Sequence, residues 1–211
     1  MNALIENPLA TLRAALPQVP PQGVGRDEFV AFPDMRAPDQ AVPLAAAVLI
    51  PVIARAEPTL LFTQRTAHLS KHSGQISFPG GRREPTDLSP VETALRETRE
   101  ETGIEPGLVS IAGFLPRYVT GTGFDISPVV GVLAPGFVLT PDPREVAEIF
   151  EVKLSFFLDP ANAKQMSRDL GGRSRHVYVF EPEGRIIWGI TAALLFDFAG
   201  RLNAGHAKES A

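Results

Sequence analysis

The sequence contains no cysteine, and this absence removes several kinds of chemistry. Without thiols there is no thiolate nucleophile, no thiolate metal site and no disulfide bond. Any catalysis therefore depends on oxygen and nitrogen groups. The absence of cysteine also fits a reducing compartment, and we expect the protein to be cytoplasmic.

A surplus of basic residues is lacking as well. The formal net charge is −4 and the isoelectric point is near 5.6, so the chain as a whole does not attract polyphosphate chains. We therefore expect no nucleic-acid partner. A small anionic substrate would need local cations or metal ions.

The sequence also lacks the features of a membrane anchor or an export signal. An apolar stretch at residues 42–54 is interrupted by Pro43 and Pro51 and is shorter than the roughly 20 residues that span a bilayer. Glu6 and Pro8 stand where an export signal has positive charge followed by an unbroken apolar run. We expect no membrane partner and interpret the apolar stretch as a buried strand.

The composition that remains is typical of a globular protein, with 211 residues, of which 44% are hydrophobic and 21% charged. We predict an N-terminal peripheral segment and linker at residues 1–40, and one main domain at residues 41–211. The segment has an amphipathic stretch at residues 8–16, and we expect it to pack on the core rather than build it. We expect a monomer or a homodimer.

Apolar runs of strand length predict a sheet in the main domain. They lie at residues 45–53, 59–63, 76–78, 108–115, 126–133 and 175–180. Residues 189–198 have the pattern of an apolar helix, which we expect to belong to the core. Strands combined with helices predict an α/β or α+β domain built in layers around a mixed sheet.

The clearest single element is a helix over residues 90–102. Ser89 is a good N-cap, Pro90 suits the first helical position, and Glu92 completes a capping box with Ser89. Gly103 suits the left-handed residue that ends the last turn. The sequence therefore defines both ends of this helix.

This helix carries three glutamates, Glu97, Glu100 and Glu101, within one arc of its surface. The ordinary interpretation is an exposed face whose charge Arg96 and Arg99 partly neutralise. Repulsion does not decide against it, because like-charge neighbours cost only about 0.2–0.5 kcal/mol per pair on an exposed helix.

The chain before the helix favours a metal site over that interpretation. Pro79, Gly80 and Gly81 place backbone without side chains just ahead of the glutamates, and such a loop brings carbonyls to a metal or amides to a phosphate. With no cysteine and only four histidines, oxygen ligands indicate Mg²⁺ or Mn²⁺. These ions commonly take phosphate oxygens as further ligands. The sequence thus predicts a divalent-metal site that holds a diphosphate.

The same residues resemble the Nudix box, which is Gly, five residues, Glu, seven residues, then Arg-Glu-aliphatic-x-Glu-Glu-x-Gly-aliphatic. The matching positions are Gly81, Asp87, Arg96, Glu97, Glu100, Glu101, Gly103 and Ile104. Three departures are visible. Asp87 stands where the pattern has Glu, eight residues separate it from Arg96, and Thr98 replaces the aliphatic residue.

A second signature ahead of the box is similar to that of one Nudix subgroup, the coenzyme A pyrophosphatases. The subgroup carries Leu-Leu-Thr-x-Arg-Ser, Leu-Arg-x-His-x-Gly and Phe-Pro-Gly-Gly. This chain has Leu-Phe-Thr-Gln-Arg-Thr at 61–66, Leu-Ser-Lys-His-Ser-Gly at 69–74 and Phe-Pro-Gly-Gly at 78–81. Ser70 replaces the subgroup's arginine, with Lys71 adjacent, and weaker similarity continues at 120–121, 127–131, 145–146 and 188–192.

The resemblance implies a Nudix fold, with a mixed β-sheet sandwiched between helices, and hydrolysis of coenzyme A to adenosine 3′,5′-bisphosphate and 4′-phosphopantetheine. It implies that Glu97 and Glu101 are metal ligands and that Glu100 is a third ligand or holds water. A carbonyl of Gly80 or Gly81 is a further candidate ligand. Arg96 is expected to orient the carboxylates rather than contact the substrate.

The general base and the substrate contacts are less well defined. Nudix enzymes use either a box glutamate or an acid from a distant loop, and Glu145 is the leading candidate for such an acid, followed by Glu148. Arg65, Lys71 and His72 are candidates for binding the diphosphate or the 3′-phosphate, and Arg65 is favoured. Arg82 and Arg83 are alternatives for the same role.

Two other functions stay open at this level. The substrate of a Nudix enzyme can instead be ADP-ribose, a dinucleotide or a nucleoside triphosphate. A protein of this fold can also be a non-catalytic binding module, although retention of Glu97, Glu100 and Glu101 argues against that.

Overall fold

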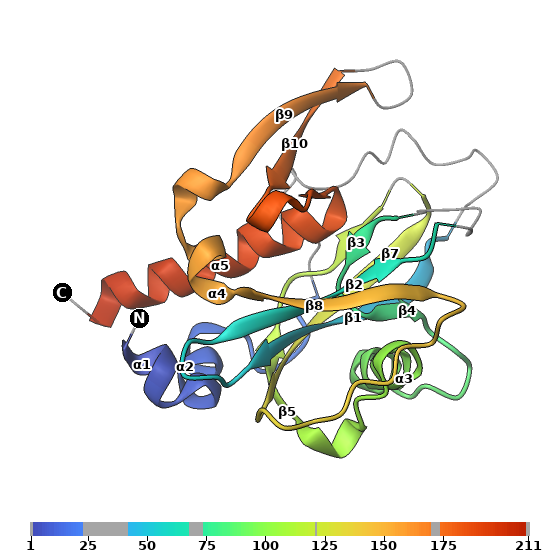
Figure 1. The fold of residues 1–211 in the computed structure, drawn as a ribbon, viewed down its shortest axis with the longest axis horizontal. Coiled ribbons are helices and arrows are strands. Elements are labelled where there is room, and N and C mark those ends of the chain that lie inside the picture. Colours follow the sequence, from blue (N-terminus) through green and yellow to red (C-terminus); the bar gives the residue numbers. More distant parts are fainter. Residues whose placement is uncertain (1, 23–41, 68–73, 121, 170–173, 210–211) are drawn as a thin grey trace.

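The computed structural model describes residues 2–22, 42–67, 74–120, 122–169 and 174–209. Its centre is a mixed sheet (Figure 1). Strands β1 (Leu44–Ile53) and β7 (Phe124–Leu133) run parallel and pair along their whole ten-residue lengths. Strand β5 (Val109–Phe114) pairs with the far side of β7, and β6 (Tyr118–Val119) pairs with the beginning of β7.

The other half of the sheet is built on β2 (Thr59–Arg65), which pairs with β8 (Val146–Lys153). Strands β1 and β2 pair only next to their connecting turn. Beyond that point, β3 (Ile76–Ser77) pairs with β2, whereas β4 (Gly80–Arg82) pairs with β1. Gly80 and Gly81, which the sequence indicated as part of a loop, therefore lie inside the sheet.

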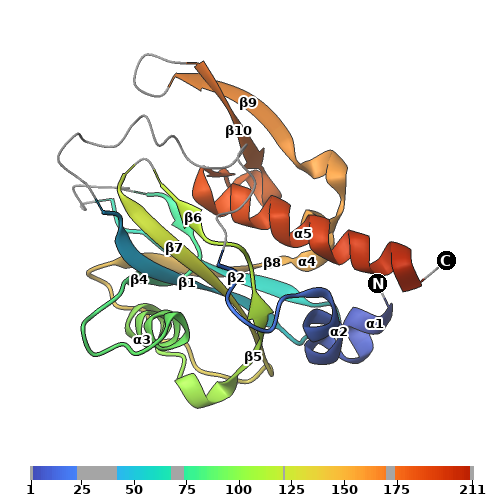
Figure 2. The same cartoon turned by 180° about the vertical axis from the view of Figure 1, so that it is seen from behind.

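Helices cover both faces of this sheet, as predicted (Figures 1 and 2). Helix α3 (Pro90–Thr102) lies on one face, with the bounds predicted from its caps. Its inner side packs with Ala47, Leu49, Phe114 and Val129. Helix α5 (Ile190–Glu209) and the short α4 (Leu154–Leu158) lie on the opposite face, over the largest apolar core.

The N-terminal helices α1 (Asn2–Glu6) and α2 (Pro8–Ala15) lie on the same face as α5. Leu4, Leu12 and Leu16 are at most 5% exposed and belong to the main core cluster. The expectation that this segment only packs on the core is therefore wrong for these leucines. These leucines pack in the same cluster as residues of α5, and this long-range packing cannot be predicted from the local sequence. The domain boundary at residue 40 lies outside the described residues and stays a prediction.

A second, three-stranded sheet stands beside α5 (Figure 1). It contains β9 (Lys164–Asp169), β10 (Ser174–Phe180) and β11 (Ile187–Trp188). Tyr178 of β10 stacks on Phe196 of α5, with ring centroids 4.0 Å apart. This contact and the buried Phe198 confirm that the C-terminal helix belongs to the core, although it extends eleven residues beyond the predicted end at 198.

The predicted strands at 45–53, 59–63, 76–78, 126–133 and 175–180 are present with small shifts of their ends. Residues 108–115 begin in a 3₁₀ turn (Pro106–Leu108) and continue as β5. Strands β4, β6, β8, β9 and β11 were not predicted. In the part of the chain that the structure describes, no helix is long and apolar enough to cross a bilayer.

Candidate active site

Helix α3 positions the predicted site, and Ser89 and Gly103 cap it as the sequence indicates. The Glu92 side chain, however, bonds to the backbone N–H of Leu88 and not to that of Ser89, as a capping box would require. The backbone N–H of Glu92 donates to Ser89 Oγ (3.2 Å), and Glu92 Oε2 accepts from the Leu88 N–H (2.9 Å). Gly103 ends the helix with φ of 77°. Its missing side chain leaves space that Thr140 fills. Both ends of the helix are thereby fixed.

The departure at Thr98 has a simple explanation. The side chain is fully buried, and its hydroxyl donates to the Ala94 carbonyl within the helix (2.6 Å). A satisfied hydroxyl can take the place of an aliphatic side chain without leaving an unpaired polar group in the core.

The three glutamates occupy different environments. The side chains of Glu100, Glu97 and Glu101 are 57%, 18% and 6% exposed. The prediction of one shared exposed face is therefore wrong for Glu101. This residue follows Thr98 by three positions and Ala94 by seven, so it continues the buried stripe of the helix and points towards the sheet.

Burial changes the ionisation of Glu101. Its pKa is raised to about 8, mainly by loss of solvent and also by the charge of Glu97, while the nearby Arg65 charge lowers it. A hydrogen bond from the Gly80 backbone N–H lowers it. The other carboxylate oxygen, Oε2, is buried and has no hydrogen-bond partner among the described residues. This buried oxygen is an unpaired acceptor that a positively charged group could bind.

Glu97 lies against the backbone of Gly81. A Cβ atom added to Gly81 would stand 2.5 Å from both Cδ and Oε2 of Glu97, closer than real Cβ contacts. Burial raises the pKa of Glu97, and the charge of Arg96 lowers it. The glycine is therefore needed here because the Glu97 carboxylate occupies the space of a side chain.

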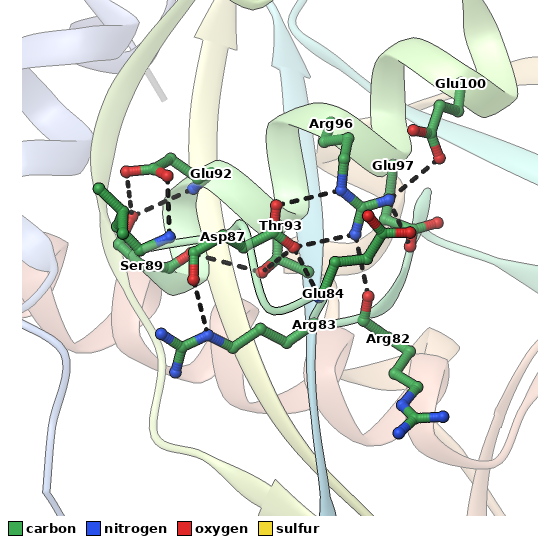
Figure 3. A network of polar contacts seen from close by, with 11 residues as sticks. Arg82, Arg83, Glu84, Asp87, Ser89, Glu92, Thr93, Arg96, Glu97 and Glu100 are labelled. Atoms are coloured by element: carbon green, nitrogen blue, oxygen red, sulfur yellow. Dashed lines mark hydrogen bonds and ion pairs between the residues drawn. The ribbon is translucent and has the colours of Figure 1, made fainter.

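Arg96 forms hydrogen bonds with three carboxylates, in the network that Figure 3 shows. Nε and Nη2 donate to the two oxygens of Asp87 (3.1 and 3.0 Å), and Nη2 also donates to the Arg82 carbonyl (2.9 Å). Nη1 donates to Glu97 Oε1 (3.0 Å) and Glu100 Oε2 (3.1 Å). All five guanidinium donors are used within the protein.

Asp87 is the residue whose role the sequence did not assign. It holds Arg96 with both oxygens, and it accepts from the Glu84 N–H (2.9 Å) and the Thr93 hydroxyl (3.0 Å). Its hydrogen bond with Arg96 lowers the pKa of Asp87 to about 2. Asp87 has a shorter side chain than the Glu of the box pattern, and one extra residue separates it from Arg96. Both of its oxygens nevertheless reach the Arg96 guanidinium. The position of Asp87 in the box was the sequence signal that could have assigned this role.

A loop of distant sequence brings Glu145 to the same place. The Asp142 N–H donates to the Glu101 carbonyl (3.3 Å), and the Thr66 N–H donates to the Glu145 carbonyl (3.0 Å). The loop is therefore tied to the end of α3 and to the end of β2. Arg65 lies between the acids, with Nη1 3.8 Å from Glu101 Oε1 and Nη2 3.9 Å from Glu145 Oε2.

Glu148 lies elsewhere. It is two residues from Phe150, which stacks on Phe62 on the α5 side of the sheet. Successive side chains of a strand alternate between faces, so Glu148 shares that face and points away from α3. Both of its oxygens accept from Arg185 (2.7 and 2.8 Å), which lowers the pKa of Glu148.

The other residues predicted to bind the substrate either lie outside the described part of the chain or point away from the glutamates. Lys71 and His72 lie outside the described residues. The Arg83 Nε donates to the Asp87 carbonyl (3.0 Å), and the end of its guanidinium points away from the glutamates (Figure 3). Arg82 contributes its carbonyl to Arg96, while its own guanidinium extends away from the network.

The donor set of this site suits a hard divalent cation. Within the described ranges, no three acidic or histidine side chains are already arranged around one point as metal ligands. Glu97 and Glu101 nevertheless face Gly81 and Gly80 of β4 from adjacent helical turns. Glu101 Oε2 is buried and has no hydrogen-bond partner in the part of the chain described. Carboxylate and carbonyl oxygens are the ligands that such ions prefer.

Comparison with known proteins agrees with this arrangement. A family model described as NUDIX domain matches residues 43–168. An uncharacterized Nudix hydrolase NudL of Yersinia enterocolitica is 40% identical over 75% of this chain and 81% of its own length. A protein of the same description from Pectobacterium atrosepticum is 36% identical over 86% of this chain and 96% of its own.

The fold is also similar to that of a MutT/nudix family protein from Enterococcus faecalis, whose crystal structure is known. The TM-score is 0.50, with 13% sequence identity, over 80% of this chain and 65% of the other. This likeness concerns the fold alone.

Proposed function

The chain belongs to the Nudix family of hydrolases and is a pyrophosphohydrolase, and from this premise we propose that its substrate is coenzyme A or a coenzyme A derivative. Hydrolysis of the diphosphate bond would give adenosine 3′,5′-bisphosphate and 4′-phosphopantetheine, or its acylated form. We place this reaction in the cytoplasm, in keeping with the absence of cysteine.

The observation that carries the proposal is the pair of signatures within residues 61–104. The subgroup signature supplies Arg65 and the two glycines of β4, Gly80 and Gly81, and the Nudix box supplies the glutamates. The proximity of Arg65 to Glu101 and of Gly81 to Glu97 supports a shared role for the two signatures.

In this proposal, Glu97 and Glu101 would hold Mg²⁺ or Mn²⁺, Glu100 would be a third ligand or hold water, and a carbonyl of Gly80 or Gly81 would be a neutral ligand. A bound divalent cation offsets the negative charge that develops on the phosphoryl oxygens. Arg96 keeps Glu97 and Glu100 in place through its two Nη1 hydrogen bonds. Arg65 binds the diphosphate, for which a forked guanidinium is well matched.

Glu145 is the proposed general base. Its side chain is 52% exposed, so water reaches it, and its Oε2 lies 3.9 Å from Nη2 of Arg65. It accepts a proton from the attacking water, while Arg65 holds the phosphoryl group in line. Glu148 is less suited, because Arg185 occupies both of its oxygens.

A substrate panel tests the proposed function. Purified protein with Mg²⁺ or Mn²⁺ is incubated with coenzyme A, acyl-coenzyme A, oxidised coenzyme A, ADP-ribose, dinucleotides and nucleoside triphosphates. We expect the highest kcat/KM for a member of the coenzyme A group, with adenosine 3′,5′-bisphosphate among the products. If ADP-ribose turns over far faster than every coenzyme A compound, the proposed substrate is wrong.

The general base is tested by a pair of matched variants. We expect Glu145→Gln to lower kcat by about 10²–10⁴-fold, the usual contribution of a positioned base. Glu148→Gln breaks a partly exposed ion pair, and we expect it to lower kcat less than tenfold, with at most about 1 kcal/mol lost in stability. Steady-state kinetics at several pH values measures both. The reverse order of effects would transfer the role to Glu148.

A further inference from the structure

Arg65 and Arg96 both contact glutamates of the site, but they are held in different ways. Arg96 uses every donor in bonds of 2.9–3.1 Å. Arg65 approaches Glu101 and Glu145 at 3.8 and 3.9 Å, which is beyond hydrogen-bond length. Its Nε is buried and has no hydrogen-bond partner within the described ranges. Arg65 thus lies close to both acids, but no hydrogen bond from the described residues fixes its guanidinium.

Glu101 has the complementary deficit. Its side chain is 6% exposed, and Oε2 is buried without a partner among the residues described. A buried donor and a buried acceptor therefore remain unsatisfied within one ion pair. Buried polar groups are nearly always paired in native proteins, because leaving one unpaired is costly. A partner that satisfies either group better can therefore separate this pair at little cost.

We propose that the Arg65 guanidinium occupies the position beside Glu101 that a divalent cation takes, and that the two exchange. On exchange, Arg65 leaves the two carboxylates and turns its forked donors towards the phosphoryl oxygens of the substrate. The substrate part of this inference rests on the proposed function, whereas the exchange itself needs only the acids and Arg65. Metal and substrate then increase each other's affinity. The metal releases Arg65 from the acids, so that it can bind the substrate, and the substrate keeps Arg65 away from the acids that bind the metal.

The exchange is tested by Mn²⁺ binding without substrate, measured from the electron paramagnetic resonance signal of free Mn²⁺. The Arg65→Gln variant removes the competing cation, and we expect it to bind Mn²⁺ about tenfold more tightly than the wild type. Arg65→Lys keeps the charge and should remain within about threefold of the wild type. An arginine with only a structural role would give weaker or unchanged Mn²⁺ binding in Arg65→Gln, and that result would overturn the inference.

Arg55→Gln is the matched control. Arg55 also pairs with a glutamate of the sheet, Glu151, but at the opposite end of β2 and through two bonds of 2.6 Å. We expect its Mn²⁺ affinity to stay within about twofold of the wild type, because the charge is far from the site. A tenfold increase in this variant as well would mean that net charge, not position, governs the affinity, and the inference would fail.

A crystal structure of the wild type soaked in Mn²⁺ alone separates exchange from simple repulsion. Exchange requires the guanidinium to have moved away from Glu101 and Glu145. If Mn²⁺ is bound while Arg65 keeps both contacts at about 4 Å, Arg65 only repels the ion and the inference is wrong. These readouts do not use coenzyme A, so failure of the substrate panel leaves them unaffected.

Discussion

The Glu101→Gln variant is expected to lose at least about three orders of magnitude in kcat while folding normally. A glutamine amide keeps the shape of the side chain but supplies no negative oxygen to a divalent cation. Removing one group that stabilises transition-state charge typically costs about 10²–10³-fold, and loss of a metal ligand adds to that. Near-normal turnover at saturating Mn²⁺ would remove Glu101 from the proposed ligand set.

The same substitution is expected to stabilise the metal-free protein at alkaline pH. The folded-state pKa of Glu101 is raised to about 8 from an ordinary value of 4.5, so the folded protein holds a proton that the unfolded chain has released. The stability that this bound proton contributes to the folded state is fully present below pH 4.5 and is lost as the pH rises to about 8. At pH 9 the wild type buries a charged carboxylate, which the glutamine variant avoids.

Urea unfolding in excess EDTA measures this effect. We expect Glu101→Gln to increase the free energy of unfolding by about 2–3 kcal/mol at pH 9, with the difference falling to near zero at about pH 4.5. Glu105→Gln is the control, because Glu105 is an exposed acid just beyond the helix, and it pairs with the exposed Arg99 at 3.3 Å. Its stability should change by less than about 0.5 kcal/mol at either pH. A destabilised Glu101→Gln protein at pH 9 would show that this burial carries no penalty.

Sequence reasoning succeeded where the determinants are local. The bounds of α3 follow from an N-cap serine, an initial proline and a terminal glycine, all of which act within a few residues. It failed for β4, because Gly80 and Gly81 are typical of a turn, and only their pairing with β1 makes them part of a strand. It also failed for β8, whose mixed charged and apolar residues gain strand structure from β2.

The candidate site shows the same division. The sequence located Glu97, Glu100 and Glu101 on one helix, since helical spacing is a local property. It did not distinguish their burial, because that depends on which side of α3 meets the sheet. The proximity of Arg65 and Glu145 joins two positions 80 residues apart and is created by the pairing of β2 with β8.

The role of Asp87 shows how a departure from a motif can be misjudged from sequence alone. A shorter acid with one more intervening residue suggests a weakened box. In the structure, the acid binds Arg96 with both oxygens, and Thr93 and the Glu84 backbone support it. The motif therefore encodes a hydrogen-bonding arrangement, which a different residue at a different spacing can also provide.

Gly81→Ala is expected to lower kcat/KM by about 10²-fold with less than about 1 kcal/mol change in stability. The added methyl carbon would stand 2.5 Å from the Glu97 carboxylate, which must move by about 1 Å to reach ordinary contact. A displacement of that size at a catalytic group can cost about 10²-fold. The backbone of Gly81 does not adopt positive φ, so alanine fits it without strain.

The control for this variant is Gly107→Ala, where an added Cβ meets nothing within 4 Å and φ is not positive. Its activity should equal that of the wild type. The cause of the loss is tested in the Glu97→Gln background, where the carboxylate is already absent. If Gly81→Ala acts by displacing Glu97, it should cost less than about threefold there, because the two changes remove the same interaction. Multiplicative losses would mean that the methyl group disturbs the site by another route, such as the glycine carbonyls themselves.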